Sequence, residues 1–451
     1  MKQPVLVGDG AMGTMLQQMG LPVGETPEEW NISHPQVIAE IHRQYLEAGA
    51  DVIETNTFGA NSYKLRGGTA SKVREMNIAG SRLAREMAGS KALVAGSVGP
   101  TGCLLAPWGE LSFADAVRAY TLQAAALAAG GADFILIETM TDLQEARAAM
   151  FGAMSADMPV AVQLTVEMSG RTLMGTPCSV AAAVLSAFKP LWVGCNCGTG
   201  PEAMLDSIRQ MRHWTNSVSA FPNAGLPEWQ AGKQVYPLDP ESFAANSHRL
   251  FEAGASLVGG CCGTTPAHIR MLRSTLGSSA RVVESHEYLQ EMIAKRSNQN
   301  KVSEGTKWVV GEESAGYLNT QGMQPGMFLA SRTNVFPLGQ DGVKYQLGPV
   351  GSIVNLEPSS WSLTGKVQDP AQVQIPIVEI PEDLASPVIA SMVAELQIGA
   401  MPVVFASHSP DALKEALLHY CGRAGVLVSA NGDDEAFVEI AVAMGALPVY
   451  R

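Results

Sequence analysis

The sequence lacks the apolar stretches that carry proteins into or across membranes. Its first ten residues hold no hydrophobic run of signal-peptide length, and no later stretch reaches the length of a membrane span without a charge or a pair of glycines. Basic residues are also scarce: 30 Lys and Arg stand against 43 Asp and Glu, and the net charge of −13 disfavours nucleic acid and anionic membranes as partners. We therefore expect a soluble, cytoplasmic protein.

Cysteine occurs in an odd number, seven, in a sequence without an export signal. This usage favours reduced thiols that serve a metal or a reaction over disulfides. Two of the seven, Cys261 and Cys262, are adjacent and flanked by Gly259, Gly260 and Gly263. Neighbouring residues of a regular strand point to opposite faces, so both thiols can reach one metal only where glycine lets the chain leave β geometry.

A second glycine-bounded segment, Gly-Cys-Asn-Cys-Gly at 194–198, offers further sulfur. Cysteine on its own is often a small buried apolar residue, but packing alone gives no reason for adjacent thiols between glycines. Together the two segments predict a zinc ion held by three thiolates.

Short β-branched runs that end in polar or glycine-rich residues alternate with helix-like stretches through the first 265 residues. Eight such runs occur: Pro4–Gly10, Asp51–Phe58, Ala92–Pro100, Asp133–Met140, Val160–Val166, Trp192–Gly198, Val218–Gly225 and Ser256–Gly263. An open doubly wound sheet would place a phosphate-binding glycine fingerprint after the first run, and Gly8–Gly13 lacks its spacing. We therefore predict an α/β fold, a closed (β/α)8 TIM barrel.

Polar residues gather where these predicted strands end, which is where barrel enzymes carry their active sites. They are Asp9, Glu54, Asn56, Glu138, Gln163, Asn196, Cys197, Asn223, Cys261 and Cys262. A carboxylate buried at a barrel mouth needs a partner, which a substrate ammonium could supply. Helix capping or an internal salt bridge is the alternative for Asp9 and Glu138, and bracing of the strand ends is the alternative for Glu54 and Asn56.

Eight motifs in order over residues 4–290 closely resemble the homocysteine S-methyltransferase domain, above all the homocysteine-binding module of cobalamin-dependent methionine synthase. The motifs are Asp9-Gly-Ala-Met-Gly-Thr, Glu54-Thr-Asn-Thr-Phe-Gly-Ala-Asn, Gly96-Ser-Val-Gly-Pro-Thr, Ile137-Glu-Thr-Met-Thr-Asp, Gly170-Arg-Thr-Leu-Met-Gly, Asn196-Cys-Gly-Thr-Gly-Pro, Pro222-Asn-Ala-Gly-Leu-Pro and Gly259-Gly-Cys-Cys-Gly-Thr-Thr-Pro-Ala-His-Ile. The resemblance implies that Cys197, Cys261 and Cys262 are the zinc ligands, with Asn223 as the fourth when substrate is absent. Cys195 departs from the family pattern, and we expect it to pack.

The same resemblance implies how homocysteine is held. Asp9 and Glu138 would grip its ammonium group, and the backbone amides of Gly10 and Ala11 would help to hold its carboxylate. Zinc with three thiolates is a poor Lewis acid for water but able to deprotonate a fourth thiol. The expected reaction is therefore methyl transfer to the homocysteine thiol, which yields methionine and needs no general base.

Two other functions stay open at this point. One is a methyltransferase of the same family that moves a methyl group between a small donor and a corrinoid protein, and the other is a non-catalytic docking subunit. The chain has no Asp-x-His-x-x-Gly cobalamin motif, so a corrinoid methyl donor would have to arrive on a separate protein.

The chain divides by composition into a barrel at residues 1–294, a polar linker at 295–320 and a smaller α/β domain at 321–451. Four segments of the last part are similar in order and spacing to the first half of a pterin-binding barrel: 327–334, 377–381, 402–417 and 425–435. The polar pattern that would bind a pterin ring is altered near Glu379 and at 406–407. We therefore expect no folate binding, and packing of this part on the barrel, on itself as an open α/β layer or on another subunit.

Overall fold

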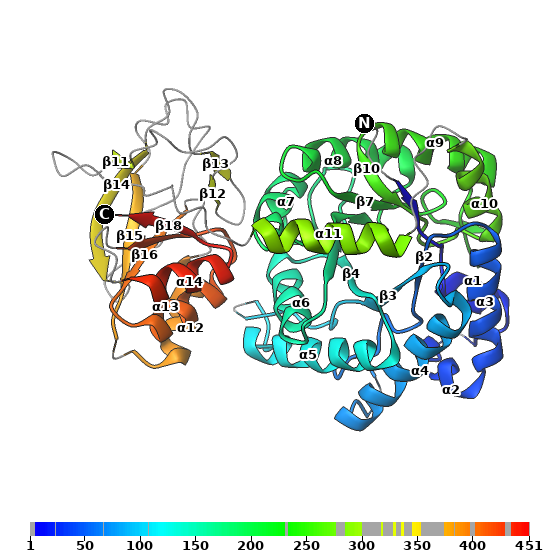
Figure 1. The fold of residues 1–451 in the computed structure, drawn as a ribbon, viewed down its shortest axis with the longest axis horizontal. Helices are drawn as coiled ribbons and strands as arrows, with labels where there is room; N and C mark the ends of the chain where they lie inside the picture. Colours follow the sequence, from blue (N-terminus) through cyan, green and yellow to red (C-terminus); the bar gives the residue numbers. More distant parts are fainter. Residues whose placement is uncertain are drawn as a thin grey trace. The chain divides into compact units, whose positions relative to one another are not determined.

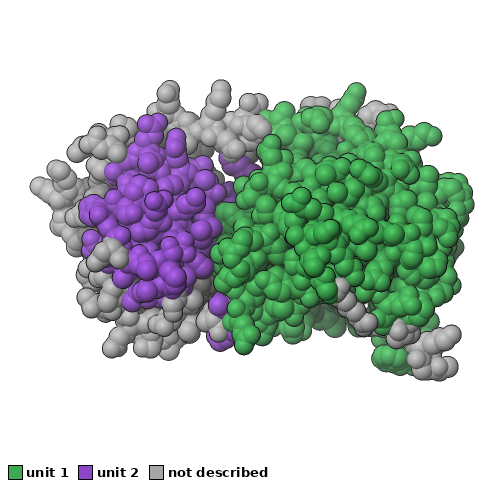
Figure 2. All heavy atoms as spheres, turned by 90° about the horizontal axis from the view of Figure 1, so that it is seen from below, with its two compact units in different colours: residues 1–105, 109–182, 190–300 green, residues 106–108, 183–189, 301–451 purple. Residues whose placement is uncertain are grey.

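The computed structural model describes residues 5–22, 24–65, 67–106, 108–230, 233–276, 285–299, 317–318, 328–330, 335–337, 345–352, 374–382, 384–396, 402–428 and 434–450. They form two compact units, coloured separately in Figure 2. The first comprises residues 1–105, 109–182 and 190–300, and the second comprises 106–108, 183–189 and 301–451. The predicted domain boundary at residue 294 falls inside a helix, and the predicted linker lies largely outside the described residues.

The first unit is the predicted barrel (Figure 1). Its eight strands are β1 (Leu6–Val7), β2 (Val52–Glu54), β3 (Leu93–Val98), β4 (Phe134–Met140), β5 (Val160–Leu164), β6 (Val193–Asn196), β7 (Val218–Phe221) and β10 (Ala255–Val258). All neighbours are parallel in the order β1-β10-β7-β6-β5-β4-β3-β2, and a parallel bridge between Gly8 and Val52 joins the first strand to the last. Seven strands lie within predicted runs and β10 begins one residue before its run, at Ala255, so the barrel prediction is confirmed.

Helices follow the strands and cover the barrel. They are α1 (Gly13–Gln18), α2 (Trp30–Ser33), α3 (Pro35–Glu47), α4 (Ala70–Ala88), α5 (Phe113–Gly130), α6 (Leu143–Ser155), α7 (Cys178–Ser186), α8 (Pro201–Arg212), α9 (Pro240–Glu252) and α10 (Pro266–Thr275), with a 3-10 turn at Pro27–Glu29. Side chains of Thr69, Ser112, Asp142 and Asp239 accept hydrogen bonds from first-turn N–H groups and so begin four of them. Within the described parts of the chain, no helix is long and apolar enough to cross a membrane.

One further helix, α11 (Ser285–Gln299), closes the base of the barrel. It crosses the N-terminal ends of the strands in Figure 1. Its side chains Tyr288, Leu289 and Met292 are buried in one cluster with residues at those strand ends, among them Phe134 and Trp192. The opposite end of the barrel, where the strands finish, is the end that carries the polar residues.

A hairpin that we did not predict lies between β7 and α9. It pairs β8 (Glu228–Gln230) with β9 (Lys233–Val235) in antiparallel register. The hairpin belongs to the loops at the C-terminal end of the barrel and leads the chain to Tyr236, which enters the site described below.

The second unit contains a six-stranded sheet in the order β11-β14-β15-β16-β17-β18. The strands are β11 (Tyr317–Leu318), β14 (Tyr345–Ser352), β15 (Gln374–Ile380), β16 (Val404–Ser407), β17 (Gly425–Val428) and β18 (Leu447–Tyr450). The last five run parallel in chain order, and helices α12 (Ser386–Leu396), α13 (Pro410–His419) and α14 (Glu435–Ala443) connect the last four and pack side by side (Figure 1). The smaller α/β region was thus predicted correctly.

One expected part of that region differs. The described part of 327–334, β12 (Phe328–Ala330), lies outside the six-stranded sheet and pairs with β13 (Val335–Pro337) in a separate hairpin. At the altered pterin position, the Ser407 hydroxyl donates to the Ile380 carbonyl at 2.9 Å and so joins β16 to β15. The absence of folate binding stays a prediction.

Candidate metal and substrate site

Three thiols meet at the C-terminal end of the barrel. Cys197 directly follows β6, while Cys261 and Cys262 follow β10 after two glycines. Their sulfur atoms all lie within 4.8 Å of one another. Tetrahedral zinc with Zn–S bonds of about 2.3 Å needs sulfurs about 3.8 Å apart. The three sulfurs are therefore gathered closely enough to hold one metal ion after small side-chain movements.

The backbone around the thiols leaves β geometry, as the glycines predicted. Cys197 has a φ of 56° and Gly263 a φ of 81°, both in the left-handed region. A non-glycine residue in that region costs roughly 1 kcal/mol or more, so its neighbours must hold it there. They do so through hydrogen bonds: the Cys197 N–H donates to the Phe221 carbonyl at 3.0 Å, and the Cys261 N–H donates to the Pro222 carbonyl at 2.8 Å.

The thiols are unequal in acidity. Hydrogen bonds from Cys261 and Cys262 lower the pKa of the Cys197 thiol to about 3. The hydrogen bond to Cys197 raises the pKa of Cys262 to about 11 and that of Cys261 well above its ordinary value. One thiolate is thus stabilised by two neutral thiols, and binding of a metal to all three would release the remaining protons.

Asn223, after β7, lies against this cluster. Its side chain is buried and hydrogen-bonded to the Cys197 sulfur, while its amide oxygen has no hydrogen-bond partner among the described residues. A buried acceptor without a donor is unfavourable by about 1–3 kcal/mol. Three thiolates and one amide oxygen make a four-ligand set that fits a tetrahedral metal ion.

The buried carboxyl groups of Asp9 and Glu138 and the partly buried Glu54 occupy the neighbouring part of the mouth. Asp9, after β1, accepts the Glu54 N–H through Oδ2 at 2.9 Å, while its Oδ1 has no partner in the described structure. Glu138, in β4, accepts the Ser97 hydroxyl at 2.5 Å through Oε1. The side chain of Glu54 is hydrogen-bonded to Glu138.

Burial disfavours the ionised form of each of these three acids. Burial raises the pKa of Asp9 and of Glu54 well above their ordinary values, and it raises the pKa of Glu138 to about 6. None of the salt bridges formed by the described residues includes any of the three. The alternative of an internal salt bridge for Asp9 or Glu138 therefore finds no support in these residues. A buried acidic site of this kind is chemically suited to a cationic group.

Asn196 joins the acids to the thiols. Its Nδ2 donates to Glu138 Oε2 at 3.2 Å and lies 3.9 Å from the Cys261 sulfur. Its Oδ1 accepts the Thr139 N–H at 2.7 Å, which fixes the amide orientation. Thr139 has a φ of 60°, so the chain is held in the left-handed region beside Glu138 as it is at Cys197. Asn196 thereby fixes the position of the acids relative to the thiols.

The predicted carboxylate-binding amides lie beside Asp9. A Cβ atom on Gly10 would come within 2.6 Å of the Thr264 hydroxyl and 2.9 Å of the Tyr45 ring, so only glycine fits there. The Ala11 N–H already donates to the Thr264 hydroxyl at 3.1 Å. A role for Gly10 and Ala11 in holding the substrate carboxylate stays a prediction, and for Ala11 it would require an exchange of partners.

Other strand-end polar residues serve the scaffold. Asn56 donates to the Pro27 carbonyl at 2.8 Å and to the Asn31 side chain at 3.0 Å, so it braces the loops as its alternative reading held. Gln163 donates to the Ser219 hydroxyl at 3.0 Å inside the barrel. Cys195 is buried and packs against Met211, with 3.7 Å between the sulfurs, in agreement with its predicted role.

Sequence reasoning missed Tyr236. Its hydroxyl is hydrogen-bonded to the Cys262 sulfur, and burial raises the pKa of this phenol above its ordinary value. A tyrosine 27 positions before Gly263 in the chain carries no local sign of this contact, because the β8–β9 hairpin brings it there. It is a donor to one of the candidate ligands.

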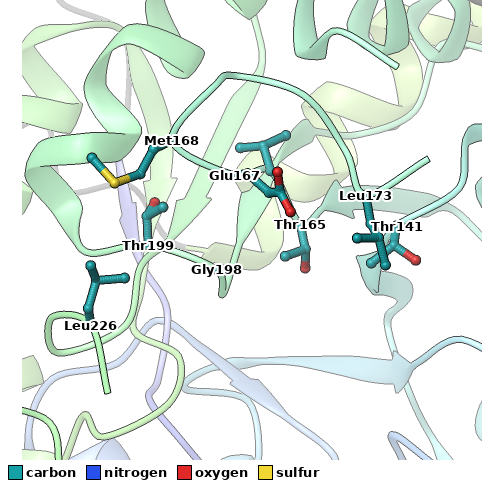
Figure 3. A pocket seen from close by; sticks show the side chains of 9 residues that line it. Thr141, Thr165, Glu167, Met168, Leu173, Gly198, Thr199 and Leu226 are labelled. Atoms are coloured by element: carbon teal, nitrogen blue, oxygen red, sulfur yellow. The ribbon is translucent and has the colours of Figure 1, made fainter. Parts of the chain in front are cut away.

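A pocket of 390 Å³ lies at the same end of the barrel, and Figure 3 shows side chains that line it. Gly198, the neighbour of Cys197, is one of its lining residues. The walls come from the loops after β4, β5, β6 and β7. The lining residues are Thr141, Thr165, Val166, Glu167, Met168, Leu173, Gly198, Thr199 and Leu226. Met168, Leu173 and Leu226 are large apolar side chains that are at least half exposed around it.

Fold, thiols and acids together define a (β/α)8 barrel protein that carries a three-thiol cluster and an acidic cluster at one end of the barrel. A model of the homocysteine S-methyltransferase family matches residues 6–276, and this chain belongs to that family. It is 42% identical over 305 residues to methionine synthase of Mycobacterium tuberculosis (strain ATCC 25618 / H37Rv), an alignment that covers 62% of this chain and 25% of the relative.

A second relative, methionine synthase of Mycobacterium leprae (strain TN), is 42% identical over 292 residues, with 59% of this chain and 24% of the relative covered. The chain thus spans about a quarter of the length of these relatives. Among solved structures, the metallated and oxidized forms of the homocysteine methyltransferase MmuM from Escherichia coli each match with a TM-score of 0.52 at 25% identity, over 61% of this chain and 97% of the other.

Proposed function

We propose that this chain transfers a methyl group to the thiol of homocysteine, giving methionine, with a zinc ion held by Cys197, Cys261 and Cys262. The observation that carries the proposal is the meeting of three thiols and a buried acidic cluster at one end of one barrel. Family membership and the methionine synthase relatives support the same reaction.

The donor set fits zinc. Three thiolates with the free amide oxygen of Asn223 supply four ligands of the kinds that tetrahedral zinc takes, and the metallated form of a related homocysteine methyltransferase supports a metal in this fold. When bound, zinc would lower the pKa of the homocysteine thiol, so that the sulfur is a thiolate at neutral pH. Reduced thiols of this kind also fit a reducing compartment, which keeps the cytoplasm as the expected location.

The acids orient the amino acid end of the substrate. Asp9 Oδ1 lacks a donor in the described structure, and Glu138 is fixed by Ser97 and Asn196, so both are placed to accept ammonium hydrogens. Because Asn196 lies between Glu138 and Cys261, the ammonium and the reacting sulfur would be held a set distance apart. Such positioning converts binding energy into alignment of the nucleophile.

The bond changes balance without a protein base. The thiol proton would pass to solvent on binding, the sulfur electron pair would attack the methyl carbon, and the bond from that carbon to the donor would break with its electrons staying on the donor. Methionine, a neutral thioether, is a weaker ligand than a thiolate and is released. The protein contributes binding, orientation and exclusion of water.

We further propose a corrinoid on a separate protein as the methyl donor. The methionine synthase relatives are about four times as long as the matched region, which leaves room in them for a donor-carrying part. The exposed apolar side chains Met168, Leu173 and Leu226 around the pocket next to Gly198 are the kind of surface on which a protein that carries the donor could dock. Folate is not expected to bind the second unit, and calorimetry with methyltetrahydrofolate on the full chain tests that.

The reaction is tested by titrating homocysteine into the zinc-loaded chain and then supplying methyl donors. Saturable binding, followed by methionine formation from a methylated corrinoid, is the expected result. Methyl transfer from a small donor to a corrinoid without use of homocysteine would establish the alternative enzyme. Absence of homocysteine binding would instead leave the non-catalytic docking subunit.

A further inference from the structure

Glu54 stands at the end of β2, between the strands that carry Asp9 and Ser97. Its backbone N–H donates to Asp9 Oδ2 at 2.9 Å, which braces the ends of β1 and β2. That bracing uses only the main chain, so it leaves the Glu54 side chain unexplained.

The Glu54 side chain turns toward Glu138 and not toward solvent. The two carboxyl groups are hydrogen-bonded to each other, which requires a proton between them, while Glu54 Oε1 is buried without a partner among the described residues. An ordinary structural glutamate at this depth would have a cation or several donors. Here the carboxylates of Glu138 and Asp9 are charged neighbours that add to the effect of burial and raise its pKa further.

The unsatisfied atoms match the donors of an ammonium group. Asp9, which is 1% exposed, offers Oδ1, Glu54 offers Oε1, and Glu138 offers a carboxylate that is already oriented. A protonated primary amine has three N–H donors and one positive charge. Three acceptors in one buried cluster, two of them without donors, are the complement of that group.

We propose that Glu54 is a third substrate-binding carboxyl group, which with Asp9 and Glu138 accepts the three N–H hydrogens of the homocysteine ammonium. This inference rests on the proposed function and deepens it, because it assigns selection for a free α-amino group to a residue beyond the predicted pair. In the substrate-free protein Glu54 holds the proton that it shares with Glu138. On binding, that proton is released to solvent and the ammonium takes its place.

The test compares two ligands on the zinc-loaded full chain. One is L-homocysteine, and the other is 4-sulfanylbutanoate, which has the same thiol and carboxylate but no amino group. Glu54→Gln keeps the size of the side chain and a donor toward Glu138 but removes the charge. It should weaken homocysteine binding at least tenfold, leave 4-sulfanylbutanoate within about twofold and keep the zinc content of the wild type.

Controls separate this role from a structural one. Glu110→Gln changes an exposed acid in the loop after β3 and should alter neither affinity. Glu54→Asp keeps the charge one methylene farther away and should recover part of the preference for homocysteine over 4-sulfanylbutanoate. Equal loss for both ligands, or no loss for homocysteine, in Glu54→Gln would overturn the proposal. If the wild type itself fails to bind homocysteine, the proposed function fails.

Discussion

Tyr236 lies directly over Gly263, the residue that follows the cysteine pair. A Cβ atom on Gly263 would come within 2.2 Å of the Tyr236 Cγ, so the tyrosine ring fits there only because position 263 is glycine. The phenol hydroxyl is hydrogen-bonded to the Cys262 sulfur. A hydrogen bond of this kind stabilises the thiolate relative to the protonated thiol. Substitution of a group that donates such a bond to a metal ligand typically lowers metal affinity 10- to 100-fold.

We therefore expect Tyr236→Phe to weaken zinc binding about tenfold while the fold is kept. The loss of the donor raises the pKa of Cys262, so protons compete better with the metal. Competition with a chromophoric chelator at pH 7 measures the dissociation constant. Tyr63→Phe, at an exposed tyrosine, is the matched control, and equal affinity in the two variants would count against the role of Tyr236.

Removal of any one of Cys197, Cys261 and Cys262 by substitution with Ala should abolish most zinc binding and all methylation of homocysteine. Each thiolate is one of the four proposed ligands, and the remaining set would no longer complete a tetrahedron. Metal analysis of the purified variants is the measurement.

The control substitutions are Cys103→Ala, Cys178→Ala and Cys421→Ala, whose thiols lie outside the cluster. These variants should keep the metal of the wild type. Full zinc occupancy in Cys261→Ala would remove the basis for the three-thiolate site.

Glu138→Ala should weaken homocysteine binding by roughly 2–4 kcal/mol, the usual effect of deleting one member of a desolvated charge pair. The variant should bind as much zinc as the wild type, because Asn196 lies between Glu138 and the Cys261 sulfur. Calorimetric titration gives both the affinity and the stoichiometry. An unchanged dissociation constant would reduce Glu138 to a structural residue.

The buried acids predict a pH dependence of stability in the metal-free and substrate-free protein. Burial raises the pKa of Glu138 from 4.5 to about 6, so its contribution to stability is fully present below pH 4.5 and is lost as the pH rises through 6. The side chain at position 138 in the Glu138→Gln variant cannot ionise, so the variant does not lose this contribution. The free energy of unfolding of the variant minus that of the wild type should therefore rise by up to about 2 kcal/mol between pH 4.5 and pH 7.5.

Urea unfolding of both proteins across that pH range measures the difference. Glu110→Gln, at an exposed acid, should show no such trend relative to the wild type. A Glu138→Gln variant that tracks the wild type at every pH would mean that the carboxyl is already matched by a positive or donor group.

A chain that ends after Gln299 should fold, bind zinc and bind homocysteine. All eight barrel strands, the three thiols and the three acids precede this residue, and α11 is needed to cover the base of the barrel. A shorter chain that ends before Ser285 lacks Tyr288, Leu289 and Met292. It should be less stable, because the apolar residues that these side chains cover at the barrel base would be exposed to water. Thermal unfolding and zinc content of the two chains decide whether the boundary belongs after α11.

The barrel could be predicted from sequence because each parallel strand is a short apolar run ended by glycine or by a polar residue. The same signal located the thiols and Asp9, since residues directly after such strands share one end of the barrel. The thiols also carry their own spacing signal, because adjacent cysteines between glycines are hard to explain by packing.

The roles of Glu54 and Tyr236 could not be read in the same way. For Glu54 the sequence left bracing of the strand ends open as an alternative, and its contact with Glu138 depends on β2 and β4 both turning a side chain into the mouth, which no spacing in the chain encodes. Tyr236 reaches Cys262 only through the path of the β8–β9 hairpin. Contacts between residues far apart in the sequence depend on the tertiary structure. The ends of strands, in contrast, can be recognised from the local sequence.

Closure of the barrel base by α11 also governs how small reagents meet the thiols. With Tyr288, Leu289 and Met292 packed across the strand starts, the cysteine sulfurs are approached from the mouth, through which the proposed substrate would enter as well. A homocysteine molecule seated there stands between the sulfurs and any alkylating or oxidising agent. Substrate occupancy should therefore act as chemical protection of the metal ligands, so that the protein is most vulnerable to inactivation when its substrate is scarce.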